Sequence, residues 1–267
     1  MDKPSNPEDY IEWWNKRSDV KIDKAAEGQY TYVSTFVKYN FENSRGWKEL
    51  IHQLHNYDAE YQRRYGYDLL MKRPEDIKLD IKEWGSFLSK VWRKNVVNNK
   101  NWDKEEIQPD GGWVTPLNWF ERINDIVRTR VVVKYFDGVG LLLDKMCDHF
   151  RNYECECIPD WEAREEGYYA AHLNLVRDYE LLFGLETKKK SIRVEIQVTT
   201  QMKDVIGALT HKYYAEKRMR LELPEEKWQW DYNCDEFAPN YIGHIVHYVE
   251  GAIMAIRDRG QVNGKNR

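Results

Sequence analysis

The chain contains few cysteines and none of the short motifs that mark several common enzyme classes. Four cysteines in 267 residues are too few to form a disulfide framework for a chain of this length. The sequence has no GxxxxGK(S/T) phosphate loop, no GxGxxG dinucleotide motif and no GxSxG nucleophile elbow. These absences argue against P-loop, Rossmann-type and α/β-hydrolase enzymes.

Long apolar runs and a strong charge bias are also missing. No apolar run approaches the roughly 20 residues that would span a bilayer, and Met1–Ser5 lack the apolar segment of a signal peptide. We therefore expect a cytoplasmic protein with reduced cysteines and no membrane partner. The formal net charge is −4, so any anion binding must depend on a local basic patch.

Apolar residues make up 42 % of the chain, and their spacing predicts both helices and strands. Helices are expected from Asn6, Gly46, Pro74 and Thr200, and over residues 138–151 and 239–259. Strands are expected near residues 125–135, 153–160, 168–177, 179–185 and 191–199. Residues 18–44 fit either a strand or a helix, and residues 98–118 are a polar loop rich in turn residues.

The order of these elements, helices followed by strand–helix–strands and then helices, is typical of an α+β fold. We expect a single mixed β-sheet flanked by helices. Residues 1–73 would form an N-terminal, mostly helical extension, residues 74–220 the core, and residues 221–267 a C-terminal helix and tail packed on that core. The apolar residues of the last two helices are expected to face inward: Met202, Val205, Ile206, Leu209, Tyr213, Ile242, Ile245, Val249, Ile253 and Ile256.

Two acidic residues are the first candidates for chemistry. The strand period places Glu195 and Gln197 on one face of their strand, opposite apolar side chains. A carboxylate in that position must be solvated, paired or bound to a ligand. Asp125 stands at the start of another predicted strand, and Mg²⁺ is commonly held by one or two carboxylates together with substrate phosphates. The alternatives are an ion pair between Asp125 and a nearby arginine, and a solvated Glu195.

Basic and aromatic residues supply further candidates. Lys90, Arg93 and Lys94 neighbour each other on one face of a predicted helix, where they could hold a triphosphate or simply be solvated. Tyr168 and His172 are four residues apart on a predicted strand and share a face. The tyrosine ring could stack on a base and the histidine could contact phosphate or sugar, or the pair could be buried against a helix.

Two other features carry weaker signals. His244 and His247 are three residues apart on a predicted helix without an acid in a known metal pattern, so we interpret them as surface histidines. Residues 188–190 are a run of lysines at a predicted solvated hairpin tip.

Taken in order, the segments around the two acids and Tyr168 resemble the synthetase domain of the RelA/SpoT family, which includes the small alarmone synthetases. That family combines a strand with Asp-x-x-(Gly/Ala)-x-Arg, a Gly-Tyr-(Arg/Gln)-Ser-x-His segment, and Glu-(Ile/Val)-Gln-Ile-Arg-Thr followed by a long helix containing a histidine. The matching residues here are Asp125, Arg130, Gly167, Tyr168, His172, Glu195, Gln197, Thr200 and His211. The resemblance covers roughly residues 80–220.

The resemblance implies a nucleotidyltransferase-like fold and transfer of the β,γ-diphosphate of ATP to the 3′-hydroxyl of GDP or GTP, giving (p)ppGpp. It implies that Asp125 and Glu195 are the catalytic residues and hold Mg²⁺. It also implies phosphate contacts from Lys90, Arg93, Lys94 and Arg130, and acceptor contacts from Tyr168, His172 and Gln197.

Several positions depart from the family pattern and leave the acceptor open. The Arg-x-Lys that begins the family's ATP-binding helix falls on Trp84 and Ser86, and the arginine of the Glu-x-Gln-x-Arg-Thr motif is Thr199. One alternative is a toxin of the same family that pyrophosphorylates the 3′ end of tRNA, for which an antitoxin protein is a candidate partner. A second alternative is a non-catalytic domain that binds a nucleotide or a protein.

Overall fold

The computed structural model describes residues 3–102, 104, 107–153, 155–220 and 228–265, with side chains described except at 211–220 and 260–265. In this part of the chain, one mixed sheet has the strand order β1-β2-β5-β4-β3. The strands are β1 (Asp80–Ile81), β2 (Val127–Val133), β3 (Glu156–Ala163), β4 (Tyr169–Phe183) and β5 (Glu186–Thr200). Strands β2 and β5 are parallel and the other neighbours are antiparallel. The sheet confirms the predicted α+β class with helices flanking a single mixed sheet.

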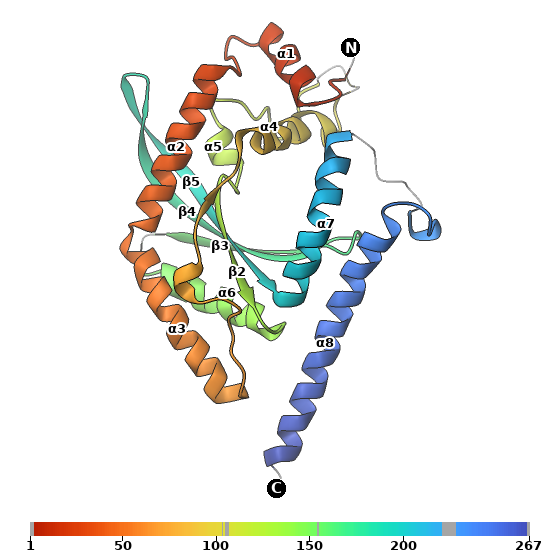
Figure 1. Ribbon diagram of the computed structural model, residues 1–267. Helices are drawn as coiled ribbons and strands as arrows, with labels where there is room; N and C mark the ends of the chain where they lie inside the picture. The colour runs from red at the N-terminus through yellow and green to blue at the C-terminus, as the bar shows by residue number, and fades with distance from the viewer. Residues whose placement is uncertain (1–2, 103, 105–106, 154, 221–227, 266–267) are drawn as a thin grey trace.

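The helices surround this sheet, and Figure 1 shows α2 and α3 on the side of the molecule opposite α7 and α8. They are α1 (Pro7–Arg17), α2 (Lys24–Glu42), α3 (Arg45–Tyr65), α4 (Trp84–Trp92), α5 (Trp119–Arg122), α6 (Asp137–Phe150), α7 (Gln201–Arg220) and α8 (Phe237–Lys265). Short turns of helix occur at η1 (Pro74–Asp76), η2 (Arg93–Val97) and η3 (Trp228–Trp230). Among the described residues, no helix has both the length and the apolar character needed to cross a membrane.

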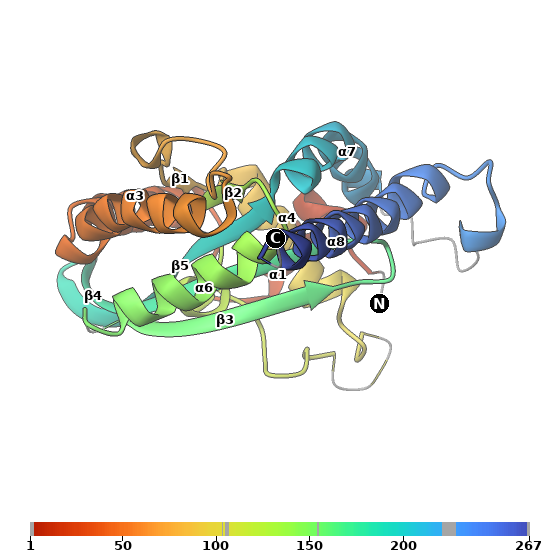
Figure 2. The same cartoon turned by 90° about the horizontal axis from the view of Figure 1, so that it is seen from below.

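The two faces of the sheet differ in character, and this difference positions the site. Val194, Ile196 and Val198 are fully buried on one face, where α6 packs against β3, β4 and β5 (Figure 2). Arg128, Glu195 and His172 occupy alternate positions and therefore lie on the other face. One face thus builds the core and the other is left for polar side chains.

Two expectations from the sequence are corrected at the N-terminal side. Residues 18–44 contain helix α2, whose Tyr30, Val33, Val37 and Phe41 are buried at helical spacing. The helix expected from Pro74 is only the turn η1, because the following residues form the edge strand β1. The amide of Lys82 donates to the carbonyl of Ile126 at 2.9 Å beside this strand, and α4 begins only at Trp84.

Two expected strands are a single strand. The segments 168–177 and 179–185 both belong to β4, which pairs with β5 without a break from Ala171 to Phe183. Strand β3 also begins and ends about three residues later than predicted, at Glu156–Ala163. Pairing with β5 maintains the extended conformation through Asp178, where the local sequence alone suggests a turn.

The predicted inward face of the last two helices is wrong at several positions. Val205, Leu209, Ile245 and Ile256 are exposed. Helix α8 instead buries a face that includes the polar residues Asn240 and Glu250 together with Val246 and Met254, so apolar periodicity could not identify it. The side chains of Tyr213 and His211 lie outside the described side chains, and the expected boundary at residue 221 adjoins residues 221–227, which are outside the described part of the chain.

Candidate active site

Neighbouring strands bring the polar candidates into two rows across one face of the sheet. Arg128 on β2, Glu195 on β5 and Asn174 on β4 are cross-strand neighbours and form the first row. The second row, two residues along each strand, contains Arg130, Gln197, His172 and Asp160. Because side chains two residues apart on a strand share a face, these residues line one continuous surface.

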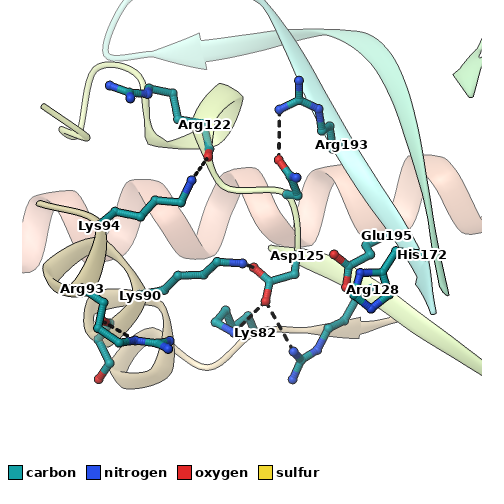
Figure 3. A network of polar contacts seen from close by, with 12 residues as sticks. Lys82, Lys90, Arg93, Lys94, Arg122, Asp125, Arg128, His172, Arg193 and Glu195 are labelled. Carbon is teal, nitrogen blue, oxygen red and sulfur yellow. Dashed lines mark hydrogen bonds and ion pairs between the residues drawn. The ribbon is translucent and has the colours of Figure 1, made fainter. Parts of the chain in front are cut away.

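Asp125 lies two residues before β2 and is enclosed by positive charges (Figure 3). Its Oδ1 accepts a hydrogen bond from Lys90 Nζ at 2.7 Å, and its Oδ2 accepts one from Lys82 Nζ at 2.9 Å. Arg128 Nη1 lies 3.5 Å from the same Oδ2. Burial by itself would raise the pKa of Asp125, but the charges of Lys90 and Lys82 outweigh it and hold the pKa below its ordinary value.

Asp125 therefore forms the ion pair that the sequence offered as an alternative, and its partners are Lys82 and Lys90 as well as Arg128. Arg128 also connects the two predicted acids, since it pairs with Asp125 and is the cross-strand neighbour of Glu195. Figure 3 shows the carboxylates of Asp125 and Glu195 near the Arg128 side chain. Asp125 lies just before β2, and Glu195 lies on β5, which pairs with β2, so the two acids are not separated by the apolar core.

Glu195 belongs to a chain of hydrogen bonds along the same face. Gln197 Nε2 donates to Glu195 Oε1 at 2.7 Å, which confirms the predicted shared face of these two residues. Arg130 donates to Gln197 Oε1 from Nε and Nη2, at 3.4 Å each, and forms an ion pair with Asp204 at 3.0 Å. Gln197 therefore fixes one oxygen of Glu195, while Arg130 is held at the beginning of α7.

Further cations surround Asp125, and only some were predicted from the sequence. Lys94 Nζ donates to the carbonyl of Arg122 at 3.2 Å, and burial together with the charges of Lys90 and Arg122 lowers its pKa. Arg193 Nη1 donates to Asn124 Oδ1 at 3.0 Å, directly beside Asp125. Arg93 differs from the other predicted cations, because its Nε donates to the carbonyl of Ser89 on its own helix at 3.3 Å. The site thus carries more positive than negative charge.

The sequence does not predict Arg122 and Arg193 as site residues, and it offers Lys82 only as a further residue that could hold ATP beside Lys90 and Arg93. Lys82, Arg122 and Arg193 come from the edge after β1, from α5 and from β5, and no local motif connects these segments. The burial of Lys82, at 9 % exposed, is the clearest sign of its importance, and it depends on the folded structure.

A cavity of about 530 Å³ opens beside β1 and β2, and Arg128 and Gln197, which contact the two acids, are among its lining residues. Its lining also includes Lys72, Lys78, Arg130, Asp204, Ile77 and Val131. This volume is within the range of small-molecule sites, which span roughly 300–1,000 Å³. Planar guanidinium groups suit both stacking on a base and bidentate phosphate contacts.

The predicted acceptor residues lie on the other side of Glu195, at β4 and β3. Tyr168 is 46 % exposed, and the guanidinium of Arg164 lies 5.2 Å from its ring centroid. Its pKa is raised mainly by burial and, to a smaller extent, by the negative charges of Glu162 and Glu195. His172 is buried, with Nδ1 3.8 Å from Glu162 Oε1.

Two groups of side chains could hold a metal ion. Asp125 and Glu195 form the predicted pair. Asp160, Glu162 and His172 form a second group, because each offers a ligand atom within 4.8 Å of the others. Both groups offer two carboxylates, the ligands that Mg²⁺ prefers, and the second group adds an imidazole.

The lysine run predicted at a hairpin tip lies within β5 instead, after the turn at Gly184 and Leu185, and its lysines are paired with acids. Lys188 lies 3.1 Å from Glu186, and Lys189 lies 2.8 Å from Asp178. Lys190 is 2.8 Å from Glu121. At about 3.3 Å per residue along β5, Lys188 to Lys190 lie roughly 16–23 Å from Glu195.

Comparison with known proteins identifies the fold. No family model matches the sequence, and no curated protein sequence matches it. The structure is similar to small alarmone synthetase 1 from Bacillus subtilis bound to its product pppGpp, with a TM-score of 0.54, 16 % identity, and coverage of 85 % of this chain and 98 % of that chain. It is also similar to a GTP pyrophosphokinase family protein from Streptococcus pneumoniae, with a TM-score of 0.54, 16 % identity, and coverage of 86 % and 96 %. The chain therefore has the fold of RelA/SpoT-type synthetase domains, as the sequence motifs predicted.

Proposed function

We propose that the protein is an ATP-dependent pyrophosphotransferase that moves the β,γ-diphosphate of ATP to the 3′-hydroxyl of a nucleotide, with GDP or GTP as the favoured acceptor. One observation carries the proposal: an ionised Asp125, enclosed by Lys82, Lys90 and Arg128, lies just before β2, the strand that pairs with β5 beside Glu195. The fold shared with small alarmone synthetases supports the same chemistry.

The cluster around Asp125 suits the phosphates of ATP. Phosphoryl-transfer sites act mainly by positioning and by stabilising charge, and they need several cations close to one carboxylate. When ATP binds, Lys82, Lys90 and Arg128 would exchange part of their contact with Asp125 for contacts with phosphate oxygens. The cavity beside β1 and β2 lies next to this cluster and would take the remainder of ATP against Arg130.

The donor set also fits Mg²⁺. Asp125, just before β2, and Glu195, on the adjacent strand β5, offer carboxylate oxygens, and Oε2 of Glu195 has no hydrogen-bond partner within the described part of the chain. A bound Mg²⁺ would neutralise phosphate oxygens and align them for in-line attack. Lys82 and Lys90 would then donate hydrogen bonds to phosphate oxygens in place of Asp125.

The acceptor side is built around Tyr168. Its half-exposed ring provides a surface on which a base can stack, and the negative charge of Glu195 contributes to the raised pKa of Tyr168. In the reaction, the 3′-oxygen of the acceptor forms a bond to the β-phosphorus of ATP. The bond from that phosphorus to the α,β-bridging oxygen breaks, and AMP leaves with the electron pair. Glu195 accepts the proton of the hydroxyl, held in position by Gln197.

A second candidate acceptor is the 3′ end of tRNA, and one observation favours it. The side of the site beyond Tyr168 carries Asp160, Glu162 and Glu165, with Arg164 as the neighbouring cation. Repulsion from these acids opposes an acceptor with a 5′-diphosphate or triphosphate and is weaker for an RNA end, which carries one phosphate per nucleotide. The paired lysines of β5 do not add to an RNA surface.

The test is a transfer assay with ATP labelled in the β,γ-diphosphate, Mg²⁺, and GDP, GTP or bulk tRNA as acceptor. Label in a guanosine nucleotide supports the first acceptor, and label in tRNA supports the second. Asp125→Asn keeps the size of the side chain and should abolish transfer, whereas the exposed Asp178→Asn should leave it unchanged. Absence of transfer to every acceptor would refute the proposal and favour a non-catalytic binding domain.

A further inference from the structure

Helix α8 crosses the turn that carries Tyr168 at unusually close range. Gly167 has a φ of +72°, and a Cβ added there would lie 2.3 Å from the carbonyl oxygen of Asn240 on α8. A Cβ added at Gly243 on α8 would lie 2.3 Å from the carbonyl oxygen of Gly167. Neither position has room for a methyl group, so the backbones of the turn and the helix are in direct contact.

The residue after Tyr168 is held by side chains of α8. The Tyr169 ring stacks on His247 with centroids 3.7 Å apart and planes 7° apart. His244 Nε2 donates to the carbonyl of Glu165 at 2.8 Å, so its Nδ1 accepts the hydrogen bond from the Tyr169 hydroxyl at 3.0 Å. Both histidines therefore contact the turn and are not the free surface residues that the sequence suggested.

Helix α8 is also joined to the end of the strand that carries Glu195. Thr200, the last residue of β5, donates its hydroxyl hydrogen bond to the buried carboxylate of Glu250. Lys203 Nζ lies 3.4 Å from Glu250 Oε2 and 3.1 Å from His247 Nδ1. The same ammonium group lies 5.3 Å from the centroid of the Tyr169 ring. These contacts connect α8, the turn and β5 in one cluster.

We propose that α8 positions the acceptor turn, residues 164–169, and that Tyr169, His247 and Gly243 are positioning residues for the acceptor. Tyr168 lies between Gly167 and Tyr169, the first residue of β4, and both of these neighbours contact α8, so the same contacts restrict the direction in which the Tyr168 side chain points. This inference rests on the proposed function and adds that the C-terminal helix determines how well the acceptor binds. In this arrangement ATP binds on the β2 side of Glu195, so the Kd of ATP should not depend on α8.

The test compares His247→Ala with His247→Phe in steady-state transfer assays. His247→Ala removes the stacked ring, and we expect about a tenfold rise in the KM of the acceptor, with the Kd of ATP unchanged within about twofold. His247→Phe keeps an aromatic ring against Tyr169 and should restore most of the loss. Tyr248→Ala, at an exposed neighbouring position on the same helix, is the matched control and should have no effect.

A second variant guards against a general loss of folding. Alanine favours a helix over glycine by about 1 kcal/mol, so Gly243→Ala should stabilise α8 itself while its methyl group displaces the turn. We expect a rise in acceptor KM at least as large as for His247→Ala. An unchanged acceptor KM in both variants, or an equal loss of ATP binding, would overturn the inference.

Amide hydrogen exchange separates this inference from the proposed function. If α8 positions the turn, His247→Ala should accelerate exchange across residues 164–169 and leave α4 unchanged, whether or not the protein transfers diphosphate. If the wild-type protein is inactive with every acceptor, the proposed function fails and the exchange result alone decides on the turn. Unchanged exchange in residues 164–169 would refute the positioning role.

Discussion

At the scale of single residues, Asp125 has two consequences that can be measured separately. It is buried and ionised because Lys82, Lys90 and Arg128 enclose it, so the three cations also depend on its charge. Removing one partner of a buried ion pair leaves the others uncompensated, which costs more than the pair contributes as a whole. The same residue should therefore affect stability even where no substrate is present.

We predict that Asp125→Asn lowers the free energy of unfolding at pH 7 by roughly 2–4 kcal/mol. The folded-state pKa of Asp125 is depressed, so its contribution is present above the ordinary aspartate pKa of about 3.9 and is lost as the pH falls toward the folded-state value. Urea unfolding of both proteins between pH 7 and pH 3 should show the difference shrinking with acid. A difference independent of pH would contradict the charged pairing.

Substitution of Tyr168 tests whether the base of the acceptor stacks on its ring. Stacking of a base on an aromatic ring contributes about 1–3 kcal/mol, so Tyr168→Ala should raise the KM of the acceptor by about tenfold to a hundredfold. Tyr168→Phe keeps the ring and should stay within a few-fold of the wild type. The KM of ATP, measured alongside at saturating acceptor, should change little in either variant. An equal rise in both KM values would count against a stacking role.

At the scale of elements, local patterns predicted the strands but not their environment. The sequence predicted which side chains of β5 share a face, because side chains alternate between the two faces along any strand. Val194, Glu195 and Ile196 follow this alternation. Strand β1 could not be predicted, because two residues become a strand only through pairing with β2. The buried face of α8 was assigned wrongly because Asn240 and Glu250 occupy it.

The same distinction applies to the candidate site. The acids, Tyr168 and His172 follow from short motifs, whereas Lys82, Arg122 and Arg193 come from three separate segments that only the folded chain brings to Asp125. Their role is a property of long-range pairing, which a single sequence does not reveal.

The β4–β5 hairpin yields an element-scale prediction about RNA. Because Lys188 and Lys189 are paired with Glu186 and Asp178, and both lie roughly 20 Å or more along β5 from Glu195, the double substitution Lys188→Ala, Lys189→Ala should change transfer to any acceptor by less than about twofold. Transfer assays with GDP and with tRNA check this. A selective loss with tRNA alone would show that these lysines bind RNA after all.

At the scale of the whole molecule, one hydrophobic core runs from Tyr10 in α1 to Val198 in β5, so the N-terminal helices and the sheet share their packing. Helix α8 joins this structure mainly through polar contacts. Near its C-terminal end, Arg257 donates to Asp137 Oδ2 at 2.8 Å and to the Tyr61 hydroxyl at 2.7 Å. These bonds attach α8 to the beginning of α6 and to α3, far along the helix from its contact with the acceptor turn.

We therefore predict that Arg257→Met lowers the free energy of unfolding by roughly 1–3 kcal/mol, because within the described part of the chain Asp137 then keeps only the hydrogen bond from the Tyr61 hydroxyl, while methionine keeps much of the side-chain volume. Arg259→Met, at an exposed position two residues further along α8, is the matched control and should change it by less than about 0.5 kcal/mol. Urea unfolding gives both values.

Helix α8 contacts the rest of the molecule both at the acceptor turn and at Arg257. Arg257→Met should therefore raise the acceptor KM by less than His247→Ala does, because the stacking of His247 on Tyr169 remains in place. A rise in the acceptor KM larger than that of His247→Ala would mean that the contacts of Arg257, and not the contact at Gly243, determine the position of the turn.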